Sequence, residues 1–189
     1  MGGVMATLRV VALPGDGVGP EVTAAARHVL EAVARRGEHV LEWEEHDVGY
    51  AAWLRWGTPI TEEALAACRE GPAVFLGAVG DPRADTVVPQ DRPEAALLRL
   101  RRELGCFANL RPARLDPALA DASVLRPDIV AGCDFVVVRE LTGGIYYGAP
   151  RSYDADEGRA VNTLVYTVPE VERVARAAFD LARTRRAHV

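Results

Sequence analysis

The sequence from residue 8 to residue 22 reads Leu8-Arg-Val-Val-Ala-Leu-Pro-Gly-Asp-Gly-Val-Gly-Pro-Glu-Val22: an apolar run, a glycine-rich turn and a proline that suits the first turn of a helix. Two further strand patterns follow, an alternating one at 40–44 and an apolar one at 74–79, and a helix start lies between them at 61–65. Strands that alternate with helices favour a parallel sheet with helical cover. The sequence therefore predicts an α/β fold.

The glycine-rich turn has two interpretations. Gly15, Gly17 and Gly19 follow the spacing GxGxG, which lacks the third glycine position of the dinucleotide-binding fingerprint. From spacing alone, a simple tight turn is at least as good an interpretation as a cofactor loop. The helix after it should carry an apolar inner face made of Val22, Ala26, Val29, Leu30 and Val33.

A second stretch, Arg139-Glu-Leu-Thr-Gly-Gly-Ile-Tyr-Tyr-Gly148, follows the apolar strand pattern at 135–138. Arg139 offers a planar, permanently charged fork for two carboxylate oxygens, and Tyr146 offers a hydroxyl that can donate or accept a proton. The glycines between them allow a tight turn. Taken alone, the stretch fits a surface salt bridge beside a turn equally well.

A helix expected over residues 94–104 would carry Glu94, Leu97, Leu98 and Arg101 on one face. Two leucines between opposite charges are unusual for a core stripe and indicate the wall of a pocket. Arg111, just before Pro112, adds another cation. Together with the stretch at 139–148, these residues suggest a site for a small polycarboxylate that has a short alkyl branch.

Several segments, in this order and spacing, resemble the 3-isopropylmalate dehydrogenase branch of the β-decarboxylating dehydrogenases. They are 13–22, 92–94, 97–101, 107–112, 139–148 and 169–176. The resemblance extends along nearly all of this chain but over only about the first half of the family's chain. It implies an isopropylmalate dehydrogenase-like fold, a parallel-rich sheet with flanking helices, from which the C-terminal half is absent. Two incomplete domains are expected: 1–105 on the cofactor side, and 106–189 with the substrate side and a dimer arm.

The implied activity is the NAD-dependent oxidative decarboxylation of a 3-alkylmalate, a step of leucine biosynthesis. The resemblance assigns roles by position. The substrate carboxylates would be bound by Arg101, Arg111 and Arg139, and the general acid would be Tyr146. The residues next to the alkyl branch and the nicotinamide would be Glu94, Leu97 and Leu98. The cofactor would be bound by Gly15, Asp16 and Gly17, together with Glu94. Two leucines favour an aliphatic branch over a third carboxylate, and so 3-isopropylmalate over isocitrate.

The family also uses Mg²⁺ or Mn²⁺, held by several aspartates, and a lysine. All 22 basic residues of this chain are arginines. The spacing of its aspartates, among them Asp16, Asp81, Asp85 and Asp134, does not match the family's metal motif, so no metal ligand is assigned. We therefore expect the isolated chain to be inactive as a dehydrogenase. It would be a fragment of a dehydrogenase, one half of a split enzyme completed by a C-terminal chain, or a shortened carboxylate-binding or cofactor-free domain.

Residues 146–166 predict two strands joined by the polar stretch at 154–158. The resemblance implies an arm that reaches a second subunit, and hence a homodimer; the alternative is an ordinary hairpin at the edge of a sheet. A truncated fold would leave strand edges unpaired and apolar helix faces uncovered.

Composition excludes other classes of partner. The net charge of −5 and the pI of about 5.4 argue against nucleic acid. Cys68, Cys106 and Cys133 are odd in number and form no CxxC pair, which favours reduced thiols over disulfides or a zinc site. The first residues lack the pattern of a signal peptide, and no apolar run approaches the ~20 residues needed to cross a bilayer. We therefore expect a cytoplasmic protein without a membrane partner.

Overall fold

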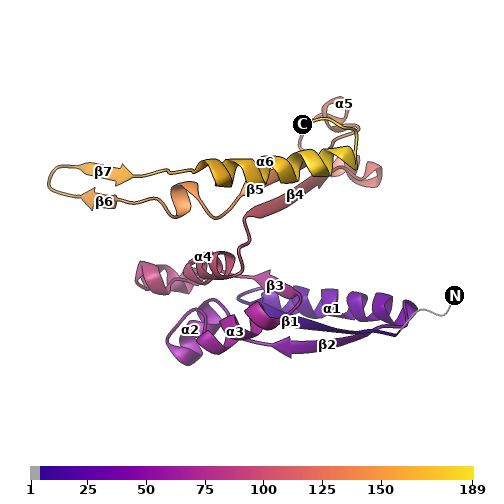
Figure 1. Ribbon diagram of the computed structural model, residues 1–189, viewed down its shortest axis with the longest axis horizontal. Helices are drawn as coiled ribbons and strands as arrows, with labels where there is room; N and C mark the ends of the chain where they lie inside the picture. Colours follow the sequence, from indigo (N-terminus) through magenta and orange to yellow (C-terminus); the bar gives the residue numbers. More distant parts are fainter. Residues whose placement is uncertain (1–4) are drawn as a thin grey trace. The chain divides into compact units, whose positions relative to one another are not determined.

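The computed structural model describes residues 5–189, apart from the side chains of Gln90 and Asp121. The chain forms two compact units, Met1–Leu104 and Gly105–Val189 (Figure 1). Among the described residues, the first unit has one three-stranded sheet and the second unit has two separate two-stranded sheets, and each unit has its own helices.

Three parallel strands make the sheet of the first unit, and this confirms the predicted α/β fold. The strands are β1 (Thr7–Gly15), β2 (Val40–Glu45) and β3 (Val74–Ala78), in the order β2-β1-β3. Val11 of the central strand pairs with Glu44 on one side and with Val74 on the other. The apolar run that opened the sequence is therefore the middle of the sheet.

Four helices accompany this sheet: α1 (Gly19–Arg36), α2 (Tyr50–Trp56), α3 (Glu62–Glu70) and α4 (Pro93–Glu103). Between β3 and α4 the chain forms two 3₁₀ turns, η1 (Pro82–Thr86) and η2 (Pro89–Asp91). The Thr61 hydroxyl caps α3 by accepting the Ala64 amide at 3.1 Å. A buried cluster joins Val11 and Leu13 of β1 to Leu65 of α3 and Leu100 of α4, which fixes these helices on the sheet.

The packing of helix α1 corrects one prediction. Its apolar stripe was expected to face inward, but Val29 and Val33 are 59% and 62% exposed. The helix instead buries Gly19, Thr23 and Ala34. A Cβ on Gly19 would overlap the carbonyl oxygen of Pro14, so the absence of a side chain lets the helix start lie directly against the strands. The face of α1 that packs on the sheet is therefore determined by its small residues and not by its valines. The apolar stripe that contains the valines is exposed.

The second unit is built on two antiparallel strands, β4 (Ala108–Arg114) and β5 (Asp134–Glu140), connected through the short helical segments η3 (Pro117–Ala122) and α5 (Pro127–Val130). A 3₁₀ turn, η4 (Gly144–Tyr146), follows β5. The predicted pair of strands after it is confirmed as the hairpin β6 (Arg151–Asp154) and β7 (Arg159–Asn162).

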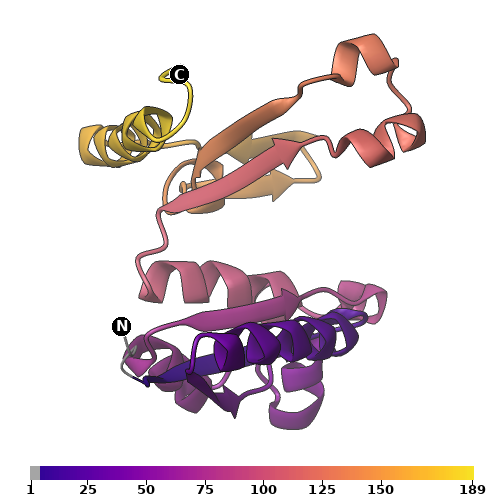
Figure 2. The same cartoon turned by 90° about the vertical axis from the view of Figure 1, so that its right-hand side faces the viewer.

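The last helix, α6 (Val168–Arg183), runs beside β5 in both views (Figure 1 and Figure 2). It begins with the capping box that the sequence predicts, because Glu170 accepts the backbone amide of Thr167 at 2.7 Å. Cys68, Cys106 and Cys133 are free thiols, and burial raises the pKa of Cys68. None of the helices within residues 5–189 combines the length and the apolar character that crossing a bilayer requires.

Candidate active site

Arg139 and Tyr146 meet where β5 ends. The Arg139 Nη2 donates a hydrogen bond to the Tyr146 hydroxyl oxygen, and the guanidinium carbon lies 5.3 Å from the centre of the tyrosine ring. The 3₁₀ turn η4 brings the tyrosine back towards the strand end. Tyr146 is 36% exposed, so part of the residue faces solvent. The two side chains that the sequence pattern proposed as reactive groups therefore form one polar pair.

Arg111 shares a face of the β4–β5 ribbon with Arg139. In this antiparallel pair Asn109 is opposite Arg139, and Arg111 is opposite Val137. Opposed residues lie on the same face and alternate along each strand, so both arginines and Asn109 lie on one side. Sequence reasoning missed Asn109, although its position two residues before Arg111 on a strand gives the signal. Two like charges on one face match a ligand with two negative charges.

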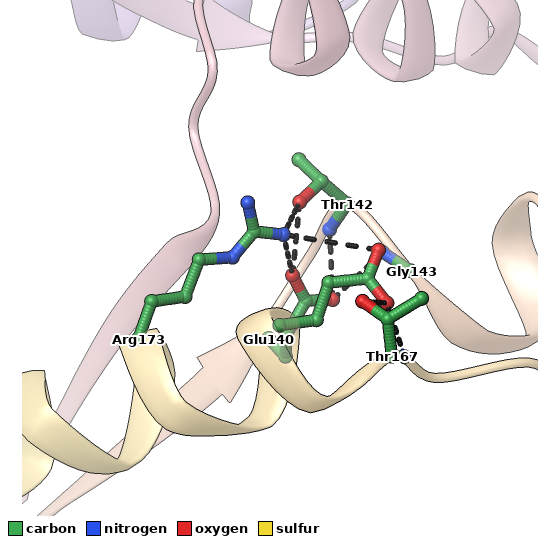
Figure 3. Close-up of polar contacts among 6 residues, drawn as sticks. Glu140, Thr142, Gly143, Thr167 and Arg173 are labelled. Atoms are coloured by element: carbon green, nitrogen blue, oxygen red, sulfur yellow. Dashed lines mark hydrogen bonds and ion pairs between the residues drawn. The ribbon is translucent and has the colours of Figure 1, made fainter.

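The turn between Arg139 and Tyr146 is organised by the side chain of Glu140, which is only 8% exposed (Figure 3). Its carboxylate accepts the backbone amides of Thr142 at 2.9 Å and of Gly143 at 2.7 Å, and the Thr142 hydroxyl at 2.9 Å. Arg173 of α6 donates to the same carboxylate at 2.7 Å. Burial raises the pKa of Glu140, but the hydrogen bonds from Gly143, Thr142 and Arg173 outweigh this and hold the pKa below its ordinary value.

The residues of helix α4 that were proposed to line a pocket are not the ones that the helix buries in the core. The helix buries Pro93, Ala96 and Leu100, whereas Glu94 is exposed. Leu97, Leu98 and Arg101 are partly buried. These residues belong to the first unit, while Arg111, Arg139 and Tyr146 belong to the second. That all of them line one substrate site stays a prediction.

Asp16, in the glycine-rich turn, is a buried junction between three loops. Its side chain accepts the amide of Tyr50 at 2.9 Å, of Ala51 at 2.8 Å and of Gly80 at 2.9 Å, and the residue is 4% exposed. A Cβ on Gly15 would overlap the carbonyl oxygen of Ala78, and Gly15 has a φ of +80°, so this position requires glycine. The turn is thus held tightly at the carboxyl ends of β1 and β3, where ligands of open α/β sheets bind.

Two features of this edge fit a cofactor better than Asp16 does. Gly17 has a φ of +56°, and an added Cβ there would meet nothing within 4 Å, so its backbone is open. The Glu94 Oε1 lies 3.7 Å from the position of a Cβ on Gly80, which places an exposed carboxylate beside the segment that follows β3. The Asp16 carboxylate is occupied by backbone amides and therefore holds the loop in shape.

Two of the aspartates named in the sequence, Asp81 and Asp134, bind arginines and are not grouped as metal ligands. Asp81 binds Arg83, whose side chain lowers the pKa of this carboxyl to about 2. Asp134 binds Arg185 at 2.6 Å and Arg186 at 3.0 Å. Across the part of the chain that the structure describes, no three His, Cys, Asp or Glu side chains gather closely enough to hold a metal ion.

The chain matches known proteins along nearly its whole length. The model of a family described as isocitrate/isopropylmalate dehydrogenase matches residues 9–189. A 3-isopropylmalate dehydrogenase of Synechococcus sp. (strain JA-2-3B'a(2-13)) is 51% identical over an alignment of 183 residues that covers 95% of this chain and 49% of that protein. A 3-isopropylmalate dehydrogenase of Chlorobium luteolum is 51% identical over 177 residues, 94% of this chain and 50% of that protein.

Solved structures agree with these matches. A crystal structure of isocitrate dehydrogenase from Methylococcus capsulatus has a TM-score of 0.75 at 29% identity and covers 94% of this chain and 48% of its own. The apo form of a β-decarboxylating dehydrogenase from Thermococcus kodakarensis has a TM-score of 0.65 at 34% identity, with 94% and 46% covered. The chain thus spans about half the length of the relatives it matches.

Proposed function

Because the chain belongs to the isocitrate/isopropylmalate dehydrogenase family, we propose that it provides the substrate-carboxylate site of an enzyme that oxidatively decarboxylates a 3-alkylmalate such as 3-isopropylmalate. The observation that carries the proposal is the contact between Arg139 and Tyr146 on an exposed strand end. A permanent cation and a proton donor that meet at one point suit a reaction in which a carboxylate is bound and a neighbouring carbon is protonated.

The arginines would bind the two carboxylates of the malate portion. Arg111 and Arg139 lie on one face of the β4–β5 ribbon, and a guanidinium can make two parallel hydrogen bonds to a carboxylate. Arg101 of α4 would be the third member of the clamp. Leu97 and Leu98, one helical turn before it, would contact the alkyl branch and favour an isopropyl group over a carboxylate.

Tyr146 would protonate the enolate carbon after carbon dioxide has left. Arg139 donates its hydrogen bond to the phenolic oxygen, so this contact does not consume the proton of the hydroxyl. That proton remains available to a substrate atom. The guanidinium therefore orients the acid without competing for its proton.

The cofactor would bind at the loops of the first unit. When bound, NAD would supply the acceptor for the hydride that leaves the hydroxyl-bearing carbon. Gly17 offers an open backbone and Glu94 an exposed carboxylate on the nicotinamide side, while Asp16 keeps the loop in place. Because the described residues do not fit Mg²⁺ or Mn²⁺, the ligands of such a metal would come from another polypeptide segment.

Two kinds of protein partner fit the surface. A complementary C-terminal segment or chain would cover the exposed valines of α1 and supply the lysine and aspartates that the activity needs. A second copy would pack on the β6–β7 hairpin, because two-stranded ribbons are marginal alone and Tyr153 is 75% exposed. The proposed assembly is therefore a homodimer of the completed enzyme.

The test is the binding of 3-isopropylmalate to the chain by titration calorimetry. Replacing Arg139 by Ala should weaken binding by about tenfold or more, since a hydrogen bond to a charged group contributes about 1.5–3 kcal/mol. Arg111→Ala should act in the same direction. Arg114→Ala is the matched control, because Arg114 lies on the same strand but on the opposite face. An affinity that survives Arg139→Ala would exclude the proposed site.

A further inference from the structure

We propose that Glu140 and Arg173 are positioning residues, which set the geometry of the Arg139–Tyr146 pair from the neighbouring helix α6 without touching the substrate. The inference rests on the proposed function, because it concerns the same arginine and tyrosine. It assigns a role to an ion pair, between the buried carboxylate of Glu140 and the partly exposed Arg173, that the carboxylate site itself does not use (Figure 3).

Glu140 closes the turn from its first residue. It follows Arg139 directly, and its carboxylate accepts the amides of Thr142 and Gly143. These two amides lie between Glu140 and the 3₁₀ turn that carries Tyr146. Arg139 takes its direction from the register of β5, and Tyr146 takes its direction from this turn. Loosening the turn therefore changes the distance between the hydroxyl and the guanidinium.

Arg173 holds the closed turn against α6. A single nitrogen, Nη2, donates to Glu140 at 2.7 Å and to the Thr142 hydroxyl, and lies 4.0 Å from Glu170. The guanidinium carbon also lies 5.1 Å from the centre of the Phe107 ring. The Phe107 carbonyl accepts the amide of Leu141 at 2.8 Å, which ties the segment before β4 to the start of the turn. Arg173 therefore contacts both of these segments, through Phe107 and through Glu140.

Packing leaves the turn little room for another conformation. A Cβ on Gly143 would lie 3.1 Å from the Glu170 carboxylate, and one on Gly144 would overlap the Tyr166 ring. Gly144 also has a φ of +68° and donates its amide to Val165 at 2.8 Å. The N-terminal end of α6 and the segment before it thus form the surface on which the turn is shaped. Arg173 is the charged contact between that surface and Glu140.

The test places a fluorine label on the tyrosines. In protein made with 3-fluorotyrosine, Tyr146→Phe identifies the ¹⁹F resonance of Tyr146 among those of the five tyrosines, and Arg139→Ala gives the shift caused by loss of the guanidinium. Arg173→Met should move the Tyr146 resonance in the same direction as Arg139→Ala and weaken binding of 3-isopropylmalate about tenfold, on the order of one charge-assisted hydrogen bond. Arg173→Lys should recover much of both effects, because one nitrogen makes the polar contacts.

Two further variants keep the test decisive. Arg176→Met removes an exposed arginine from the same helix and should change neither the resonance nor the affinity. Thr142→Val removes only the bridging hydroxyl, so it should give a smaller shift in the same direction, even if Arg173→Met fails to fold.

The two proposals fail in different ways. Unchanged affinity in Arg139→Ala would remove the proposed function but leave the ¹⁹F readout of positioning intact. A Tyr146 resonance that stays in place in folded Arg173→Met and in Thr142→Val would overturn the positioning role, even if Arg139→Ala abolished binding.

Discussion

Asp16 and Glu140 both hold a loop in place, but they do so through different hydrogen-bond partners. Each is a buried carboxylate beside the end of a strand, and each holds a loop by accepting backbone amides. Asp16 accepts three amides that lie far from it in the sequence, two from adjacent residues at the start of α2 and one from Gly80. Glu140 accepts two amides within its own turn and adds a hydroxyl and the guanidinium of Arg173. The shape of the glycine-rich turn at Asp16 therefore depends on backbone amides, whereas the turn after β5 also depends on a second side chain, Arg173 of α6.

The largest expected loss of stability follows from replacing Asp16, whose hydrogen-bond partners described above are all backbone amides. Asp16→Ala should destabilise the first unit by about 3–5 kcal/mol, because each buried amide left without an acceptor costs about 1–3 kcal/mol and water can reach part of the space. Urea unfolding followed by the fluorescence of Trp43 and its neighbours would measure the loss. Asp16→Asn keeps one acceptor oxygen and should lose less. Equal losses in the two variants would show that the charge, and not the acceptor geometry, matters at this junction.

The contacts of Glu140 should contribute less to stability than those of Asp16, and the contributions of Glu140 and Arg173 should depend on each other. Glu140→Gln and Arg173→Met should each cost about 1–3 kcal/mol, because Glu140 is buried while Arg173 is partly exposed and screened by solvent. Since the two side chains share a contact, the double variant should lose less than the sum of the single losses. A double-mutant cycle on the free energy of unfolding would measure this coupling. Strict additivity would mean that the pair acts as two independent contacts.

The dependence on pH gives a smaller effect of defined sign. The pKa of Glu140 is held below its ordinary value of about 4.3 in the folded protein, so its charged form favours folding. This contribution is fully present above the unfolded pKa and is lost as the pH falls through the folded pKa. The stability difference between the wild type and Glu140→Gln should therefore be constant from about pH 6 to 7 and shrink below about pH 4. A difference that grows on acidification would contradict the assigned direction.

An exposed carboxylate provides the baseline for both junctions. Glu103 of α4 pairs with Arg69 of α3 at 2.7 Å, with 33% and 44% of the side chains exposed. Glu103→Gln should change the free energy of unfolding by less than about 0.5 kcal/mol, because solvent and side-chain entropy offset most of such a pair. Raising the salt concentration should remove even this difference. A loss comparable to that of Glu140→Gln would mean that burial does not explain the comparison.

The parts that the sequence predicted correctly depend on local patterns. The alternation of strand and helix signals gave the parallel sheet, and Thr167 with Glu170 gave the capping box. Arg139 contacts Tyr146, as a turn with two glycines within seven residues allows, and that both residues act in one substrate site stays a prediction. These features are encoded by neighbours in the chain.

The parts that sequence reasoning missed depend on contacts between distant residues. The amides that bind Asp16 belong to residues 34 to 64 positions away, so its buried role could not be read from the GxGxG spacing. Arg173 was visible only as one arginine of a helix, because its contact with Glu140 spans 33 residues. The prediction of the buried face of α1 was wrong because the valine stripe is a strong periodic signal in the sequence. The close approach of Gly19 to the strands, which decides the packing, produces no such periodic signal.

The Glu140 turn has a consequence for hydrogen exchange. The amides of Thr142 and Gly143 donate to a carboxylate instead of a strand partner, so their protection from solvent deuterium depends on a single side chain. Their exchange rates follow the opening of this one turn, separately from the unfolding of the β4–β5 ribbon. In any longer protein that contains this segment, the exchange rates of these two amides would therefore report when the turn between Arg139 and Tyr146 is closed and when it is open.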